Sequence, residues 1–444
     1  MSDLLSIGAS GVRANQAALS VVSENIANGG VEGYSRRTIT TKEVVSVTAS
    51  GATSGHGVFV TGVSRAADMF KAASVRASGA DLARTEAGGV WLDRIQTALT
   101  GADLDTRLTA FFTAAKGVTA DPTATAPRAA MLEQARAVAG AFTATGAALA
   151  NATGELDATA DQAVADLNGL SAALAKINDG LGRVGAGSAA AANLADQRDA
   201  ILEKMSGLVD VSATIDGFGR ASVRAGGGNG VALVSGNQVS TVSYARNAAG
   251  AVVFAVQSGK DTSVLTPGGG TLGGVVDGAQ RIADARSALG ELATTFVDTV
   301  NDTQAGGRTL DGNAGNAMFT VGAAPTDISM TLDDPRGIAA ASVGEGTRGN
   351  GNLATLEALR SATNVEGGLT ALVSGNAAAI QTRRTVAAAQ TAIHDGAIAA
   401  RDAVSGVDLD SEAVDLLRFQ QAYQASSRVI SIARETLQTL LDIR

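Results

Sequence analysis

Apolar residues recur every seven positions at both ends of this 444-residue chain. Such a repeat places its members on one stripe of a helix, which must be buried against a partner. The N-terminal stripe consists of Leu5, Val12, Leu19 and Ile26, with Val22 in a second column. The C-terminal stripe consists of Leu409, Leu416, Tyr423, Ile430 and Leu437, with Phe419, Ala433 and Leu440 three positions later. The two ends are therefore expected to form long helices.

The positions of proline agree with this expectation. None of the five prolines falls in the first 121 residues or in the last 109, so nothing breaks a helix there. Asp410 is expected to cap the C-terminal helix. The simplest arrangement pairs the two ends as a coiled coil from which the middle of the chain projects. Two amphipathic helices that dock on separate cores would show the same periodicity, and the pattern alone does not choose between them.

Between its ends the chain reads as mainly α, with a small inserted β-domain. Alternating valines around glycine turns indicate extended or hairpin structure in residues 31–63. Residues 67–207 read as helices, and short alternating segments in residues 208–266 indicate antiparallel strands. Further helices are expected at residues 275–304 and 368–403.

This pattern divides the chain into four parts. The expected division is a terminal coiled-coil domain (1–30 and 405–444), a mainly helical middle domain (31–207, 267–315 and 341–404), a small antiparallel β-domain (208–266) and a short irregular segment (316–340).

Composition excludes several function classes. Hydrophobic residues make up 45% of the chain, which is enough for folded cores, but aromatic residues make up only 3%, so no large aromatic core is expected. The formal charge of −9 argues against nucleic acid, because phosphate binding needs clustered basic residues. Cysteine is absent, which excludes disulfides and thiolate metal sites. No membrane insertion and no cleaved signal peptide are expected, since neither an apolar span nor a basic leader is visible.

Candidate catalytic and ligand-binding residues are few. His56 and His394 are the only histidines, too few for a zinc motif and poorly placed for a catalytic triad. Gly268 to Gly273 has the glycine spacing of a dinucleotide-binding loop, but Pro267 precedes it and no parallel βαβ series surrounds it. The segment from Asp311 to Gly315 begins like a calcium loop, but Gly322 stands where a glutamate is needed. No catalytic, cofactor or metal residue is assigned, and a nucleotide-dependent enzyme remains the alternative from another class.

The chain ends carry a family resemblance. ALSVVSENIANGGVEGYSRR (residues 18–37) resembles the N-terminal signature of flagellar axial proteins, with Asn25, Asn28, Gly33 and Tyr34 as its motif positions. The segment from Ser405 to Arg444 resembles their C-terminal signature, centred on Gln420 and Gln421. The Tyr34-Ser35-Arg36-Arg37 run and the interior blocks NLADQRDAILEKMSGLVDVS, GGTLGGVVDGAQ and LDGNAGNAMF are similar to the hook-associated members of that family.

The resemblance implies a non-enzymatic subunit at the hook–filament junction, exported by the flagellar type III system and located outside the cell. It also implies self-association in a helical ring, contacts with the hook protein and with a second junction protein, and a chaperone on the C-terminal helix. A sister axial protein such as the hook protein is the alternative within the family. One departure is that longer relatives carry a large outer β-domain after the position of Phe319, where this chain has about twenty residues.

Charge separates the two terminal helices. Residues 1–30 contain three charged side chains, whereas residues 409–444 contain nine. A helix enclosed between neighbours cannot leave many charges unpaired, but a helix beside water can solvate them. We therefore expect the C-terminal helix to line a hydrated channel, with the N-terminal helix enclosed outside it.

Overall fold

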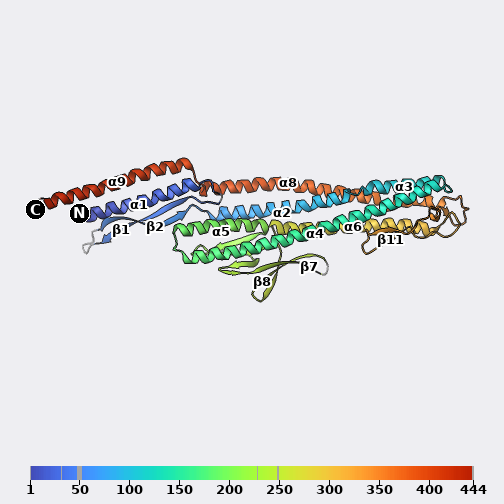
Figure 1. The fold of residues 1–444 in the computed structure, drawn as a ribbon, viewed down its shortest axis with the longest axis horizontal. Helices are drawn as coiled ribbons and strands as arrows, with labels where there is room; N and C mark the ends of the chain where they lie inside the picture. Colours follow the sequence, from blue (N-terminus) through green and yellow to red (C-terminus); the bar gives the residue numbers. More distant parts are fainter. Residues whose placement is uncertain (1, 32, 48–52, 228, 248–249, 443–444) are drawn as a thin grey trace.

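The computed structural model describes residues 2–31, 33–47, 53–227, 229–247 and 250–442. The chain forms an elongated rod, and the first and last helices lie side by side at one end of it (Figure 1). The helices are α1 (Ser2–Asn28), α2 (Met69–Thr100), α3 (Leu104–Ala120), α4 (Thr125–Arg183), α5 (Ala189–Leu208), α6 (Gly270–Gly306), α7 (Gly351–Thr363), α8 (Val365–Ser405) and α9 (Leu409–Asp442).

Both terminal helices lie where the seven-residue repeats predicted them, but the cap of α9 differs. Asp408, and not Asp410, accepts the amide hydrogen bond of residue 410 at 3.0 Å and the Ser411 hydroxyl at 3.1 Å. The correction moves the start of the helix two residues earlier, to Leu409, because the residue whose carboxylate reaches the free amides is the one just before the first turn.

The middle of the rod is a bundle in which α2 packs against α6 and α8, and α3 packs against α4. Small residues allow these helices to approach closely. A Cβ atom at Gly278 of α6 would lie 2.1 Å from Cδ1 of Trp91 on α2, so only glycine fits there. The core is mostly aliphatic, as composition predicted. Against that expectation, five phenylalanines gather at the end of the rod far from α1, with Phe296 at the centre of the group; they are Phe111, Phe112, Phe142, Phe296 and Phe319.

The β-domain packs on the side of α4 as two antiparallel sheets (Figure 1). Their strands are β3 (Val211–Ile215), β4 (Ala221–Ala225), β5 (Val231–Ser235) and β6 (Gln238–Val239), then β7 (Thr241–Arg246), β8 (Val252–Ser258) and β9 (Asp261–Leu265). Asn178 of α4 bonds the backbone of Ala221 in both directions at 2.8 Å, and Asn168 bonds that of Val242 in the same way. Because each amide satisfies a backbone donor and acceptor, these bonds fix each sheet on the helix.

One ion pair adds to the docking of the second sheet. Arg246 and the Tyr244 hydroxyl both bond the carboxylate of Asp157 on α4, the latter at 2.5 Å. Burial raises the pKa of Asp157, but these hydrogen bonds outweigh it and hold the pKa below its ordinary value.

Strands β1 (Arg37–Val47) and β2 (Thr53–Arg65) form the predicted hairpin, with Arg37 paired to Arg65 at its open end. The hairpin packs on α1. The expected boundary at residue 30 therefore does not coincide with a change of packing, since β1 and β2 pack on α1. We call α1, β1, β2 and α9 the terminal unit.

The segment after α6 is more regular than expected. It contains β10 (Gly307–Arg308), β11 (Phe319–Val321), β12 (Ile328–Met330), a 3₁₀ turn (Pro335–Gly337) and β13 (Ala341–Ser342). Helix α7 was not predicted, because Gly351 and Asn352 at its start have low helix propensity. Tertiary contacts override that preference: the buried Asn352 amide donates to the carbonyls of Thr303 and Ala339, each at 2.7 Å.

Candidate assembly site at the paired termini

Helices α1 and α9 pair in antiparallel orientation, with glycines of α1 against side chains of α9. A Cβ atom at Gly8 would lie 2.8 Å from Cγ1 of Ile430, and one at Gly11 would lie 2.8 Å from Oγ of Ser426. Small residues therefore bring the two backbones together, as they do in other closely packed helix pairs. Since β2 covers another side of α1, the N-terminal helix is enclosed between the hairpin and α9.

A cluster of buried polar residues connects the C-terminal end of α1 and the N-terminal end of α9 to the start of the hairpin. We call Asn25, Tyr34, Arg36, Arg37 and Glu412 the Asn25 cluster. Asn25 is fully buried, and its amide donates to the Arg37 carbonyl at 2.8 Å and to Glu412 Oε2 at 3.0 Å. Its Oδ1 accepts from the Tyr34 hydroxyl at 2.9 Å and from the Arg37 amide at 3.0 Å. Asn25 therefore joins the end of α1 to the start of the hairpin and to the start of α9, which is 387 positions away in the sequence.

Charges in the Asn25 cluster are paired. The side chain of Glu412 is fully buried, and it accepts a hydrogen bond from Arg36 Nε at 2.6 Å. Arg36 also reaches Asp415, one turn further along α9, at 3.3 Å. The Arg37 guanidinium lies 4.7 Å from the centre of the Tyr34 ring, and burial raises the pKa of Tyr34 although Arg37 opposes it. A buried carboxylate with its partners in place is stable, but it is costly once a partner is removed.

Helix α5 connects the Asn25 cluster to the middle of the rod. Nη2 of Arg37 donates to Asn193 and to Asp196, each at 2.7 Å. Arg65, which pairs with Arg37 across the hairpin, bonds Asp196 and Asp199, each at 2.8 Å. The interior block that begins at residue 193 thus contacts the N-terminal signature directly.

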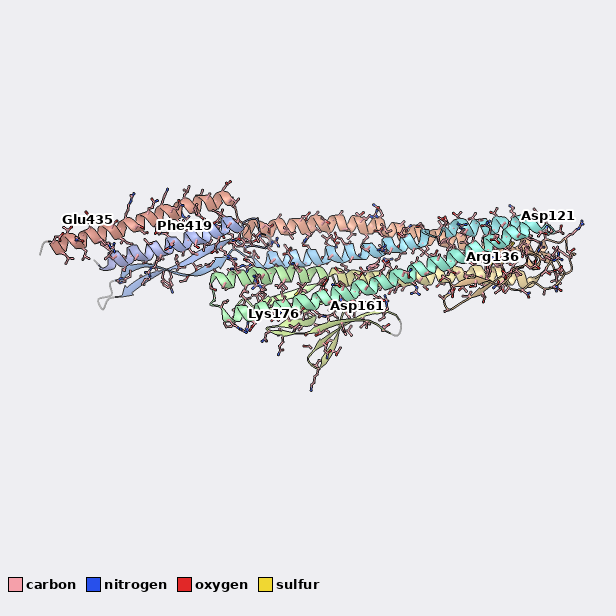
Figure 2. The ribbon with its side chains drawn as sticks, viewed as in Figure 1. Asp121, Arg136, Asp161, Lys176, Phe419 and Glu435 are labelled. Carbon is pink, nitrogen blue, oxygen red and sulfur yellow. The ribbon has the colours of Figure 1, made fainter. Side chains whose placement is uncertain are left out.

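The predicted stripe residues divide into three groups in the structure. Val22 and Ala433 are buried, and Leu5, Val12, Leu19, Leu416, Phe419 and Ile430 are partly buried. Ile26, Leu409, Tyr423 and Leu437 are exposed, and the side chain of Leu440 lies outside the described residues. Figure 2 locates Phe419 and Glu435 along α9. The α1 residues that are buried include several small or polar ones that a search for large apolar side chains overlooks, namely Gly8, Ser10, Ala14, Ala18 and Asn25.

The predicted motif positions also divide. Asn25 is the centre of the Asn25 cluster and Tyr34 is one of its members, whereas the Asn28 side chain donates to the Glu24 carbonyl within α1 at 2.9 Å. Gly33 adopts a left-handed backbone with φ of 78°, which favours glycine. Gln420 and Gln421 are exposed on α9.

Sequence reasoning missed the functional partners of these motif residues. Glu412, Asn193 and Asp196 were not among the predicted site residues. No pairing rule links Asn25 to a residue 387 positions later. The signal that could have found them is the presence of polar residues on otherwise apolar stripes of helices.

The outer side of α9 carries both charge and apolar area. Arg418 and Arg428 are exposed, and so are Val414, Leu417 and Ile432, with 58–65% of their surface accessible. Residues of this size are exposed together on a surface that binds a partner more often than on a free one.

Most of the residues considered above for nucleotide, metal or catalytic sites form hydrogen bonds or ion pairs within the chain. The Gly268 and Gly269 amides, which would face a pyrophosphate in a dinucleotide loop, donate to the carboxylate of Asp210 at 2.8 and 3.2 Å. His394 shares a hydrogen bond with Ser78 at 3.0 Å, and Asp311 pairs with Arg336. His56 lies in β2 and is partly buried. Among the described residues, no three His, Cys, Asp or Glu side chains gather closely enough to hold a metal ion.

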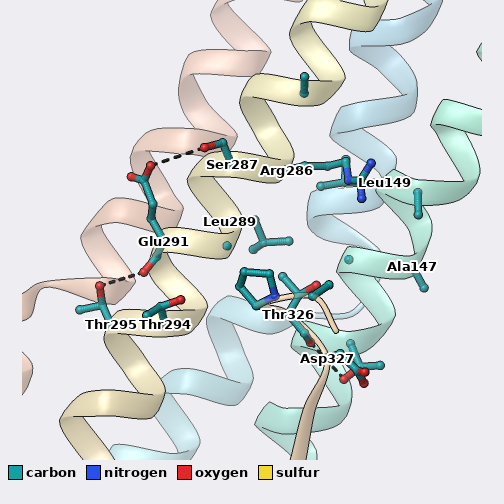
Figure 3. A pocket seen from close by; sticks show the side chains of 17 residues that line it. Ala147, Leu149, Arg286, Ser287, Leu289, Glu291, Thr294, Thr295, Thr326 and Asp327 are labelled. Carbon is teal, nitrogen blue, oxygen red and sulfur yellow. Dashed lines mark hydrogen bonds between the residues drawn. The ribbon is translucent and has the colours of Figure 1, made fainter. Parts of the chain in front are cut away.

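A cavity of about 980 Å³ lies far from the terminal unit, between α4, α6 and the turn that joins β11 to β12 (Figure 3). Most of the residues that line it have small side chains, and Gly146 and Gly290 lie against Thr326 and Pro325 of the turn. This turn lies in the region where longer relatives were expected to carry an outer domain. In the described part of the chain, no helix is both long and apolar enough to cross a membrane.

Comparison with known proteins agrees with the resemblance at the chain ends. Residues 402–443 match the family model for the C-terminal region of flagellar basal body rod FlgEFG proteins. Flagellar hook-associated protein 1 of Salmonella typhimurium is 28% identical over 341 residues, which cover 72% of this chain but only 60% of that relative. The Bacillus subtilis protein of the same name is 24% identical over 486 residues, which cover 97% of this chain and 96% of the relative.

The fold is also similar to that of a solved structure. The flagellar hook junction protein FlgK of Burkholderia pseudomallei matches with a TM-score of 0.51 at 22% identity, over 56% of this chain and 47% of that one. Residues 92–319 match the family model for the helical domain of flagellar hook-associated protein FlgK. Because that match spans just over half of the sequence, the chain belongs to the FlgK family of flagellar hook-associated proteins.

Proposed function

We propose that this protein is a structural subunit that joins the hook of the bacterial flagellum to its filament. The observation that carries the proposal is the terminal unit, in which the two family signatures meet through Asn25 and Glu412. A thin pair of helices at one end of a long rod suits packing of many copies around an axis, with the rest of each rod outside. The proposal includes self-association in a helical ring and contacts with the hook protein and a second junction protein.

We further propose that α9 lines the channel of the assembly and that α1 is enclosed outside it. Two observations support this arrangement: α1 has the hairpin on one side and α9 on another, and the outer side of α9 carries Arg418 and Arg428 in solvent. A hydrated lining would also avoid adhesion to unfolded apolar chains that pass through the channel.

Export by the flagellar type III system, to a final location outside the cell, is part of the same proposal. The exposed apolar residues of α9, Val414, Leu417 and Ile432, offer a surface for an export chaperone before assembly. After assembly the same surface would face neighbouring subunits.

A complementation experiment tests the proposal. Cells that lack the gene should build hooks without filaments, secrete filament protein into the medium and fail to swim, and the wild-type gene should restore all three. Gold-labelled antibody should mark the boundary between hook and filament. Label along the whole hook would instead favour the alternative of a hook protein. Normal filaments in the deletion strain would contradict a junction role.

The enzymatic alternative has a direct assay. The amides of Gly268 and Gly269 already donate hydrogen bonds to the Asp210 carboxylate. A bound phosphate would have to displace this carboxylate, and the two negative charges would repel each other. We therefore propose a non-enzymatic role and expect no saturable nucleotide binding by calorimetry on the purified protein. Micromolar binding that is lost on substitution of Gly268 would support the enzyme instead.

A further inference from the structure

A polar pocket lies at the joint between the terminal unit and the middle of the rod. Its volume is about 390 Å³, and we call it the joint pocket. Four segments form its wall: the loop after α1, the start of α2, the second half of α5 and the end of α8. The Arg36 amide donates to the Ser405 carbonyl at 2.8 Å beside it, so the pocket is where the terminal unit meets α8.

The carboxylates in the wall of the joint pocket are all engaged within the chain. Asp68 accepts the amides of residues 70 and 71 as the N-cap of α2, at 2.8 and 3.2 Å. Asp199 accepts from Arg65 and Arg198, each at 2.8 Å. Arg401 holds both Glu203 and Asp402, each at 2.9 Å.

Two cationic side chains in the same wall have no carboxylate partner among the described residues. Arg76 of α2 is partly buried, and Lys204 of α5 is exposed. Neither makes a hydrogen bond or an ion pair with any residue that the structure describes. Burial lowers the pKa of Arg76, although Asp199 and Glu203 nearby oppose the change. A guanidinium has five donors in a planar fork, so Arg76 in the pocket wall can take an acceptor that enters the pocket.

We propose that the joint pocket receives a carboxylate side chain from a neighbouring copy of this chain, with Arg76 as its main ligand and Lys204 at the rim. Arg76 matches a carboxylate with two parallel hydrogen bonds. A second copy is the fitting source for two reasons. Each copy carries 43 acidic against 34 basic side chains, so carboxylates are in excess on its surface, and the pocket adjoins the terminal unit. The inference rests on the proposed assembly into a ring.

This role has a signature that a structural arginine would not show. Replacing Arg76 removes no hydrogen bond or ion pair that the structure describes within the monomer, and it relieves the burial of a charge, so the variant Arg76→Met should unfold at the same temperature as wild type or higher. Assembly should suffer instead, because the incoming carboxylate would be buried without its partner. Arg94→Met is the matched control: Arg94 lies on the same helix, is exposed and, among the described residues, pairs only with exposed Glu155 at 3.1 Å.

The experiment measures binding of purified protein to isolated hooks from the deletion strain, together with thermal unfolding of each monomer. Arg76→Met should raise the concentration for half-saturation about 10-fold to 100-fold, the effect of losing a hydrogen bond to a charged group. Arg94→Met should bind like wild type. A photo-crosslinker at Ala72, in the pocket wall, should give a product of two copies of this chain, linked at an acidic segment of the second copy.

Three results would overturn the inference. They are hook binding by Arg76→Met equal to wild type, an unfolding temperature for Arg76→Met clearly below that of wild type, and a crosslink from Ala72 to hook protein alone. Wild-type protein that binds no hooks would overturn the proposed function, and this inference with it, whereas the first three results leave the proposed function intact.

Discussion

Replacing Glu412 with alanine should loosen the docking of α9 without unfolding the rod. Glu412 is the fully buried charge that holds α9 to the rest of the terminal unit. The substitution removes the Arg36 bond at 2.6 Å and the Asn25 bond at 3.0 Å. It touches no residue of the bundle core, so the middle of the rod should keep its stability.

The size of the effect follows from what each partner loses. Removing one member of a buried ion pair costs about 3–5 kcal/mol when the other is left without compensation. Arg36 is compensated in part, because 29% of its side chain is exposed and it keeps Asp415 at 3.3 Å. We therefore expect a loss of about 2 kcal/mol, below the full cost of a buried pair. If α9 opens locally while the rest of the rod stays folded, this loss makes the open population of α9 about 30-fold larger.

Hydrogen exchange of the purified monomer, read by mass spectrometry, measures that opening directly. Peptides from α9 and α1 should exchange about 30-fold faster in Glu412→Ala, while peptides from α4 and α6 should not change. Glu435→Ala is the control, since Glu435 lies on the same helix but is exposed and its side chain has no partner among the described residues. Equal exchange in Glu412→Ala and wild type, or equal acceleration in both variants, would refute the role given to the Asn25 cluster.

Three further predictions concern other parts of the chain. Ile430→Asp puts a charge against α1, so cells should build hooks, secrete unassembled filament protein and swim poorly; normal filaments from a correctly exported variant would contradict the pairing. Gly278→Ala should lower the free energy of unfolding by about 1–3 kcal/mol, because its Cβ would collide with the Trp91 indole. Gly117→Ala should raise it by about 0.5–1 kcal/mol, because a Cβ there would meet no other atom within 4 Å, and chemical denaturation measures both changes. The pKa of Asp157 is lowered in the folded state, so its contribution to the free energy of unfolding is present above about pH 4 and is lost as pH falls through the folded pKa. The unfolding temperature of Asp157→Asn should therefore depend less on pH below about 4 than that of wild type.

The sequence predicted secondary structure well where a single strong period was present. Helices α1, α8 and α9 and the hairpin of β1 and β2 lie close to the expected positions, because period and turn residues are local properties. Helix α7 was missed because its stability comes from Asn352 and its contacts with residues 303 and 339, which are distant in sequence. The cluster of phenylalanines was missed for the same reason, since composition does not say where a few large residues meet.

The candidate site was predicted only in part. Seven-residue spacing identified the face of α9 that carries Leu416, Phe419 and Ile430, all of which are partly buried. On α1 it identified Val22, which is buried, and partly buried residues such as Leu19, but it overlooked the small and polar positions Gly8 and Asn25 that contact α9. Close packing and buried polar networks depend on complementary shape and on exact partners, and neither leaves a periodic signal in one chain.

The central claim is that this chain forms the junction between hook and filament through its terminal unit. A cryo-electron microscopy map of isolated hook–filament junctions tests it most directly. We expect a ring of this chain between hook and filament, with α9 lining the channel and α1 immediately outside it. A junction without this chain, or one in which residues 1–30 lie nearest the axis while Arg418 and Arg428 are buried, would contradict the claim.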